Sequence, residues 1–196
     1  VAEAAAVAGA GSMVHVSAIG ADPASASGYG RSKGEGEQAV RAAFPNATIL
    51  RPSVAFGMED DFVNKFARMA QILPVLPVIR GEWKLQPVHA ADLGKAIAAA
   101  ALDPARYGGA TYELAGPQVT TMAELNRWIV QAIGRDRPVA EIPDAIGGLI
   151  SRLGWLPFAP ITRDQWLMMQ KDNVADPALP GFEAFGIRPA PLAAVA

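Results

Sequence analysis

Short runs of apolar and β-branched residues alternate along the chain with longer segments in which apolar residues recur every three or four positions. The short runs predict buried strands at 13–17, 47–51 and 111–115. The longer segments predict helices at 28–44, 91–102 and 121–133. This alternation is typical of an α/β fold, in which helices cover the faces of a largely parallel sheet.

The helix at 28–44 joins the first two strands, so we expect a right-handed βαβ unit. Ser17 ends the first strand, and Pro52, Ser53 and Val54 follow the second. The carboxyl ends of parallel strands lie at one edge of a sheet, where open α/β sheets bind ligands. These four residues are therefore expected together at a candidate ligand site.

The segment at 73–87 predicts extended chain, because it is rich in proline and β-branched residues. Gly81 and Glu82 are typical of a hairpin turn, and a strand is expected at 84–88.

Acidic residues near helix starts favour capping over metal binding. Asp60 or Asp61 is expected to cap a helix ending near residue 72, because no histidine or further acid completes a metal site. Asp92 is likewise expected to help cap a helix, and His89 is expected to pack or hydrogen-bond at the end of the preceding strand rather than act in catalysis.

The last third of the chain predicts three helices. Thr121 and Glu124 match the S/T-x-x-E capping box, and short helices are expected at 144–153 and 162–171. The tryptophans and methionines within 146–169 indicate either a partner-binding or membrane-surface patch, or a lid over the core.

Tyr29 and Lys33 are four positions apart, so they share one face of their helix. An ammonium beside a phenol lowers the pKa of the phenol, as a general acid/base near neutral pH requires. Ser17 is placed to hydrogen-bond the oxygen of a bound alcohol or carbonyl. The spacing of Tyr29 and Lys33 alone is weak evidence for a catalytic pair. The strand that ends at Ser17 and the loop before Tyr29 make this assignment more specific.

Several motifs, in order, resemble one superfamily. The segment VHVSAIGADPASASGYGRSKGEGE resembles the active-site segment of extended or atypical short-chain dehydrogenases/reductases, with Ser17, Tyr29 and Lys33 at the Ser and YxxxK positions. With TILRPSVAFG, LQPVHAADLGKAI and TYELAGPQVTTMAEL, the chain is similar to bacterial relatives of the NAD(P)H-binding accessory subunit of respiratory complex I. This resemblance covers nearly the whole chain.

The resemblance implies the carboxyl-terminal part of a Rossmann-like, doubly wound parallel sheet, followed by a small α/β substrate or lid region. Residues 1–57 would form the second half of the nucleotide-binding domain. Residues 58–171 would form the mixed α/β remainder, and 172–196 a loosely structured tail.

The implied cofactor is NADP or NAD. The resemblance assigns cofactor contacts to Tyr29 and Lys33, and it places Pro52, Ser53 and Val54 near the nicotinamide, although an ordinary strand-ending turn is the alternative. The Gly-rich phosphate-binding turn of this superfamily, GxGxxG, does not follow an early strand. We therefore expect a truncated chain that alone binds the nucleotide weakly or not at all.

Composition excludes several classes of function. The 196 residues are 51% hydrophobic and 18% charged, enough for one domain with a sizeable core. A net charge of -2 gives no electrostatic case for a nucleic-acid partner, and the absence of cysteine excludes disulfides and thiolate metal sites. No apolar run is long enough for a transmembrane span, which favours a cytoplasmic protein, with peripheral contact at the inner face of the cytoplasmic membrane as an option.

Two functions from different classes remain open. The first is an accessory protein that binds NAD(P)H structurally and has complex I subunits as partners. The second is an active oxidoreductase or nucleotide-sugar epimerase/dehydratase that uses Ser17, Tyr29 and Lys33. A third option is that the chain in this form binds no nucleotide.

Overall fold

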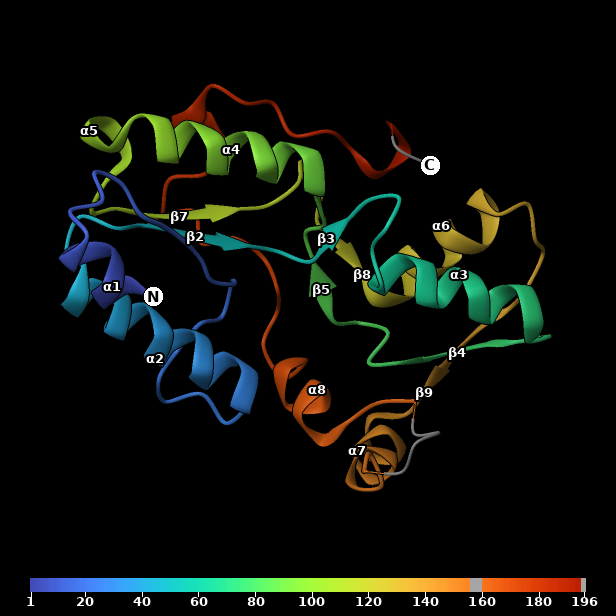
Figure 1. The fold of residues 1–196 in the computed structure, drawn as a ribbon. Helices are drawn as coiled ribbons and strands as arrows, with labels where there is room; N and C mark the ends of the chain where they lie inside the picture. The colour runs from blue at the N-terminus through green and yellow to red at the C-terminus, as the bar shows by residue number, and fades with distance from the viewer. Residues whose placement is uncertain (156–159, 195–196) are drawn as a thin grey trace.

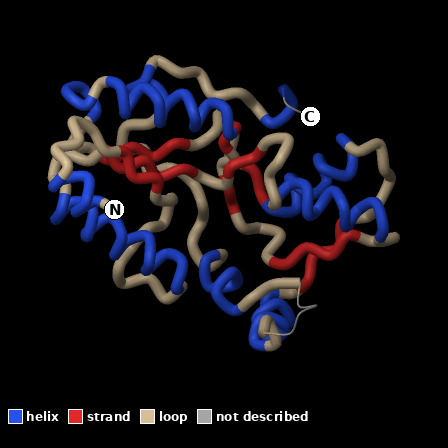
Figure 2. Tube along the Cα trace, in the orientation of Figure 1, coloured by secondary structure: helices blue, strands red, loops and turns tan. Residues whose placement is uncertain are grey.

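The computed structural model describes residues 1–155 and 160–194. Its centre is a three-stranded sheet in the order β1-β2-β7, flanked by helices (Figures 1 and 2). The strands are β1 (Val14–Val16), β2 (Thr48–Pro52) and β7 (Thr111–Leu114). Both strand pairs are parallel, so the three predicted strands and the predicted α/β class are confirmed.

Helices lie on both faces of this sheet. Helix α2 (Gly28–Ala43) joins β1 to β2 on one face, and α4 (Ala90–Leu102) lies on the other (Figure 1). The short helix α1 (Ala2–Val7) precedes β1, and α5 (Pro104–Tyr107) follows α4. Helix α2 is capped by Ser27, whose side chain accepts a hydrogen bond from the Gly30 N–H at 2.9 Å.

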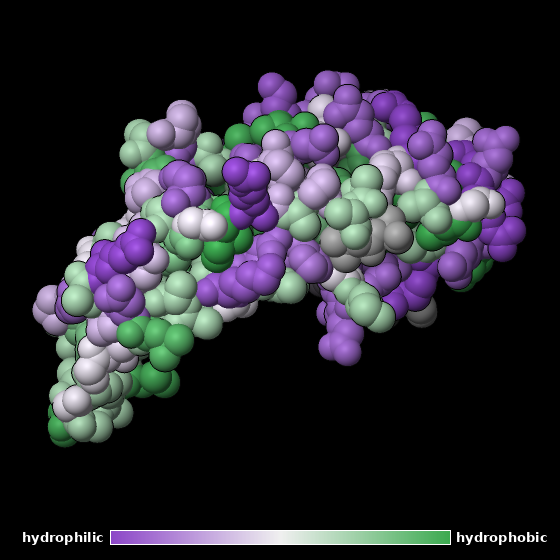
Figure 3. Space-filling model, turned by 90° about the horizontal axis from the view of Figure 1, so that it is seen from above, coloured by the Kyte–Doolittle hydropathy of each residue, from purple (hydrophilic) through white to green (hydrophobic). Residues whose placement is uncertain are grey.

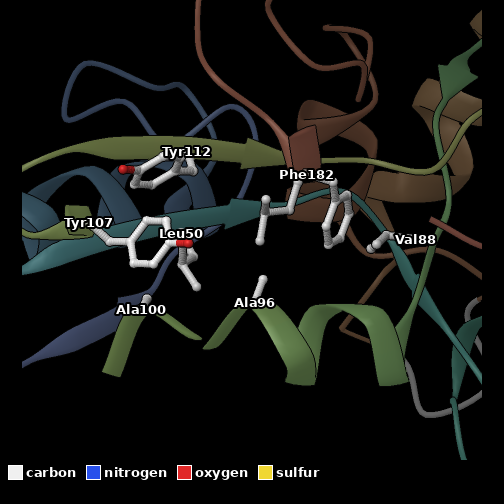
Figure 4. Packing of buried hydrophobic residues seen from close by; sticks show 8 residues of the cluster. Leu50, Val88, Ala96, Ala100, Tyr107, Tyr112 and Phe182 are labelled. Atoms are coloured by element: carbon white, nitrogen blue, oxygen red, sulfur yellow. The ribbon is translucent and has the colours of Figure 1, made fainter. Parts of the chain in front are cut away.

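The main apolar core fills the space between the sheet and α4. Its buried members share an apolar or aromatic side chain and come from β2, β6, α4, α5, β7 and the tail: Leu50, Val88, Ala96, Ala100, Tyr107, Tyr112, Leu114 and Phe182 (Figure 4). The small side chains of Ala96 and Ala100 let α4 approach the sheet closely. Burial of these groups stabilises the fold in proportion to the apolar area removed from water.

A second region contains three two-stranded sheets. The parallel pairs are β3 (Ala55–Phe56) with β6 (Val88–His89), and β4 (Leu76–Ile79) with β9 (Val139–Ile142). The antiparallel pair is β5 (Lys84–Leu85) with β8 (Thr120–Thr121). The helices of this region are α3 (Phe62–Ile72), α6 (Met122–Ala132), α7 (Asp144–Arg152) and α8 (Arg163–Met168).

The hairpin predicted at Gly81 and Glu82 is wrong. Strand β4 pairs with β9 and β5 pairs with β8, so this segment connects two separate sheets. The strand predicted at 84–88 is divided in two, because β5 ends at Leu85 and β6 begins at Val88. Turn residues indicate a change of direction, but the pairing partners lie far along the chain.

Two predicted helix caps are confirmed. Thr121 and Glu124 form the capping box at the start of α6. The Asp60 carboxylate accepts a hydrogen bond from the Val63 N–H at 2.5 Å at the start of α3, as expected for a capping acid.

The described part of the tail, residues 172–194, contacts the main core. It contains two short 3₁₀ helices, Phe182–Phe185 and Leu192–Ala194, and Phe182 is buried in the main core. Asp92 does not cap α4 as predicted. Its buried carboxylate accepts hydrogen bonds from Lys95 Nζ at 2.7 Å and from the Ala190 N–H at 2.8 Å, so it holds the tail instead.

Hydrophilic and hydrophobic side chains are interspersed on the surface seen from above, over α4 and the tail (Figure 3). Among residues 1–155 and 160–194, no helix combines the length and apolar character needed to cross a membrane.

Candidate functional site

Ser17 directly follows β1, at the carboxyl edge of the central sheet. Its N–H donates to the Leu50 carbonyl at 2.7 Å, which continues the pairing with β2. The side chain is only 3% exposed, and its Oγ donates to Glu37 Oε1 at 2.5 Å. Ser17 therefore faces α2 and is bonded to the helix rather than turned toward solvent.

Glu37 is held by Arg51 of β2. Arg51 donates from Nε to Glu37 Oε1 at 2.8 Å and from Nη2 to Oε2 at 2.7 Å, and its Nη1 lies 3.5 Å from Glu113 Oε1 on β7. Burial raises the pKa of Glu37, but the hydrogen bonds from Arg51 and Ser17 outweigh it and leave the pKa below its ordinary value. A carboxylate only accepts hydrogen bonds, so Ser17 must supply the proton of their bond.

Tyr29 and Lys33 are brought together on the first turns of α2. Lys33 Nζ lies 5.7 Å from the centre of the Tyr29 ring and donates to the Val16 carbonyl at 3.3 Å. The Tyr29 side chain is 42% exposed, and burial of its remainder raises the pKa of the phenol. Burial sets the direction of this pKa, so a lowering of the pKa by Lys33 stays a prediction.

The turn at 52–54 lies beside Ser17, as the βαβ arrangement predicted. The Ile19 N–H donates to the Pro52 carbonyl at 3.0 Å, which joins the two strand ends. The Ser53 N–H donates to the Leu114 carbonyl of β7 at 3.0 Å, and two other donors of the turn are engaged by the tail. Ser53 Oγ donates to Asn173 Oδ1 at 2.6 Å, and the Val54 N–H donates to the same oxygen at 3.1 Å.

Comparison with known proteins shows the family to which the chain belongs. The model of the family described as RmlD substrate binding domain matches residues 19–146, about two thirds of the chain. The chain belongs to this RmlD family. The match includes Tyr29, Lys33 and the turn at 52–54, and it begins just after Ser17.

Two curated relatives match nearly the whole RmlD-family chain. The NADH-ubiquinone oxidoreductase 40 kDa subunit, mitochondrial, of Neurospora crassa is 33% identical over 185 residues, covering 92% of this chain and 48% of that protein. The NADH dehydrogenase (ubiquinone) 1 alpha subcomplex subunit 9, mitochondrial, of Rattus norvegicus is 36% identical over 196 residues, covering 98% and 52%. The chain thus spans about half the length of these relatives.

The fold is shared with solved structures of the same class. A nucleoside-diphosphate-sugar epimerase of Staphylococcus aureus superposes with a TM-score of 0.69 at 14% sequence identity, covering 97% of this chain and 66% of that chain. This RmlD-family chain is therefore a Rossmann-like, atypical short-chain dehydrogenase/reductase related to the NADH dehydrogenase subunits, as the motifs implied.

Three residues near the site were not found from the sequence of this RmlD-family chain: Glu37, Asp164 and Asn173. Asp164 of α8 accepts hydrogen bonds from the N–H groups of Gly28 at 2.5 Å and Tyr29 at 3.1 Å. Asp164 and Asn173 lie far from their partners in sequence, so no spacing pattern reveals them. Glu37 gave a weak signal, since it lies two turns after Tyr29 on the same face of α2.

The segment at 146–169 is partly apolar and exposed. Ile146, Leu149 and Leu153 share one side of the α7 segment, with exposed fractions of 49%, 63% and 50%. Trp155 follows at 78%. Residues 156–159, which the prediction of a patch also includes, lie outside the described residues. The alternatives of a patch or a lid stay predictions.

Proposed function

We propose that this chain is part of an NAD(P)-binding, reductase-like protein that works with respiratory complex I, and that its nucleotide has a structural role. The observation that carries the proposal is the similarity of 92–98% of the chain to mitochondrial subunits named for NADH-ubiquinone oxidoreductase and NADH dehydrogenase. Because the chain spans about half of those proteins, both the partner and the cofactor belong to this proposal.

The geometry of Ser17 supports binding without turnover. A serine that assists carbonyl reduction donates its proton to the substrate oxygen. Here the proton of Ser17 lies in the bond to Glu37, whose ionised form is stabilised by Arg51. Ser17 is therefore a poor donor toward a substrate carbonyl.

The state of Tyr29 supports the same reading. A general acid/base works best when its pKa lies near the operating pH, whereas burial raises the pKa of Tyr29 above an ordinary value that is already high. Tyr29 and Lys33 remain suited to hold hydroxyl groups of a ribose, because both carry hydrogen-bond donors at the carboxyl edge of the sheet. The nucleotide, when bound, would supply the hydride chemistry.

The second candidate is an active oxidoreductase or nucleotide-sugar epimerase/dehydratase. The exposed position of Tyr29 beside Lys33 favours it, since a substrate can reach the phenol there. A substrate-dependent change of bound NADPH that disappears in Tyr29→Phe would support this alternative.

We further propose peripheral placement at the inner face of the cytoplasmic membrane. The exposed apolar side of α7 supports this location, because apolar side chains at helical spacing lie readily in a membrane interface. Recovery of the untreated protein only in the soluble fraction after cell lysis would contradict it.

The binding part of the proposal is tested by titrating the full gene product with NADPH and NADH, read by nucleotide fluorescence. Lys33→Ala should weaken binding about tenfold, because a charged hydrogen-bond donor is lost. Lys84→Ala is the matched control, since that side chain is exposed, and should leave affinity unchanged. Equal affinities of wild type and Lys33→Ala would remove Lys33 from the site.

A further inference from the structure

Two hydrogen-bond donors at the end of β2 converge on one oxygen atom. Ser53 Oγ and the Val54 N–H lie 2.6 Å and 3.1 Å from Asn173 Oδ1. Ser53 is 5% exposed, so its hydroxyl is largely withdrawn from bulk water. Together the two donors form a small site that recognises a carbonyl oxygen.

Backbone hydrogen bonds of the tail hold Asn173 in a fixed position at this site. Its N–H donates to the Lys84 carbonyl at 2.8 Å, and its carbonyl accepts from the Gln86 N–H at 3.1 Å. These bonds flank Leu85 in a parallel bridge at the edge of β5. Ser53 Oγ also lies 3.3 Å from the Asn173 carbonyl oxygen. The backbone of the tail is therefore anchored independently of the Asn173 side chain, which can leave the two donors while the tail stays in place.

The group that fills the site is a primary carboxamide. Nicotinamide carries the same group, with one carbonyl oxygen as acceptor and one NH₂ group as donor. The donors lie at the carboxyl edge of a parallel sheet, where ligands of open α/β sheets bind. An internal asparagine thus occupies a site that matches the carboxamide of the proposed cofactor.

We propose that Ser53 and Val54 form a carboxamide site that Asn173 fills from within the chain, in competition with the nicotinamide of NAD(P)H. This inference rests on the proposed function and deepens it. Asn173 keeps the nicotinamide from its place beside Tyr29 and Lys33, and the nucleotide is held through its other parts. Such occlusion accounts for binding without turnover.

The test uses the full gene product and two pairs of probes. NADH is compared with ADP-ribose, and NADPH with the 2′-phosphate of ADP-ribose, because the second member of each pair lacks nicotinamide. Asn173→Ala should bind NADH or NADPH about tenfold more tightly. Without the Asn173 side chain, a larger fraction of the protein has Ser53 and Val54 available for nicotinamide. The affinity for the member without nicotinamide should stay unchanged.

Asn173→Asp is the matched control. It keeps an acceptor oxygen for Ser53 and Val54, so its affinities should remain close to those of the wild type. Asn173→Ser serves as a second variant if the alanine protein is unstable, because its shorter side chain does not reach the two donors.

Unchanged affinity of Asn173→Ala and Asn173→Ser for NADH and NADPH overturns the inference. Weaker binding of only the nicotinamide-bearing nucleotides also overturns it, and would show that Asn173 supports the turn. If the wild type binds none of the four probes, the proposed nucleotide binding itself fails, which is a distinct result.

Discussion

The α4 face of the central sheet is mainly apolar, whereas the α2 face combines an apolar cluster around Val40 and Ile49 with buried charges next to the candidate site. Side chains of β2 and β7 point alternately to the two faces of the sheet. Leu50 and Leu114 point into the core under α4. Arg51 and Glu113 take part in the ion pairs on the side of Glu37. Both faces therefore bury apolar area, and the α2 face in addition uses charge to fix polar groups.

The tail is anchored on both faces of the central sheet. On the apolar face it inserts Phe182 into the core. On the polar face Glu113 Oε2 accepts a hydrogen bond from the Asp176 N–H at 2.8 Å. The tail thus closes both faces at the carboxyl edge, and its polar contacts are the ones that reach the candidate site.

The largest expected effect is on the apolar face. Leu114→Ala should lower the free energy of unfolding by about 4 kcal/mol, because Leu114 is fully buried and its loss leaves a cavity. Val119→Ala, at a side chain that is 50% exposed, is the control and should change it by less than about 1 kcal/mol. Urea unfolding measures both. A loss below about 1 kcal/mol for Leu114→Ala would show that this face is not the main core.

Breaking the charged face should cost slightly less. Arg51→Ala leaves the buried carboxylates of Glu37 and Glu113 without their cation and should lower stability by about 3 kcal/mol. Arg127→Ala removes an exposed pair with Glu141 and should cost under about 1 kcal/mol. Equal losses in the two variants, measured by the same unfolding experiment, would contradict a structural role for the network.

A smaller effect is expected in the pH dependence of stability. The pKa of Glu37 is lower in the folded protein than its ordinary value, so its contribution is complete above that value and disappears as pH falls through the folded pKa. Glu37→Gln should therefore lose less stability than the wild type between about pH 5 and pH 3.

Thermal unfolding between about pH 5 and pH 3 measures this difference in stability. On the α4 side, the buried carboxylate of Asp92 provides a comparison. Its pKa is also lowered, because hydrogen bonds from Lys95 and Ala190 outweigh its burial. Wild type and Glu37→Gln should therefore both keep the loss of stability at low pH that is due to Asp92. Identical pH profiles of wild type and Glu37→Gln would mean that the pKa of Glu37 does not differ between the folded and the unfolded protein.

The smallest expected effect concerns Tyr29. Tyr29→Phe should leave nucleotide affinity within about threefold in the full gene product, because a lost proton donor acts on a transition state more than on binding. Any turnover should disappear. Fluorescence titration measures the affinity, and turnover that persists in this variant would exclude Tyr29 as a general acid/base.

Local patterns predicted much of the fold. The strand at 47–51, the helix at 28–44 and the capping box at Thr121 were confirmed, because each depends on residues close in sequence. The pairings of β4 and β5 were not predictable, since their partners lie far along the chain.

The candidate site shows the same division. The spacing of Tyr29 and Lys33 correctly predicted that the two would lie together on one helix. The Ser17 contact with Glu37 and the occupation of Ser53 by Asn173 depend on how distant segments meet. The roles of these residues in cofactor binding stay predictions.

The proposed association with complex I is tested most directly in membranes. The native gene is tagged at its carboxyl terminus, and mild-detergent extracts are separated on a native gel followed by a denaturing second dimension. We predict that the tagged protein migrates with complex I. Migration only as a free protein, apart from the complex, would contradict the account and would direct attention to turnover at Tyr29.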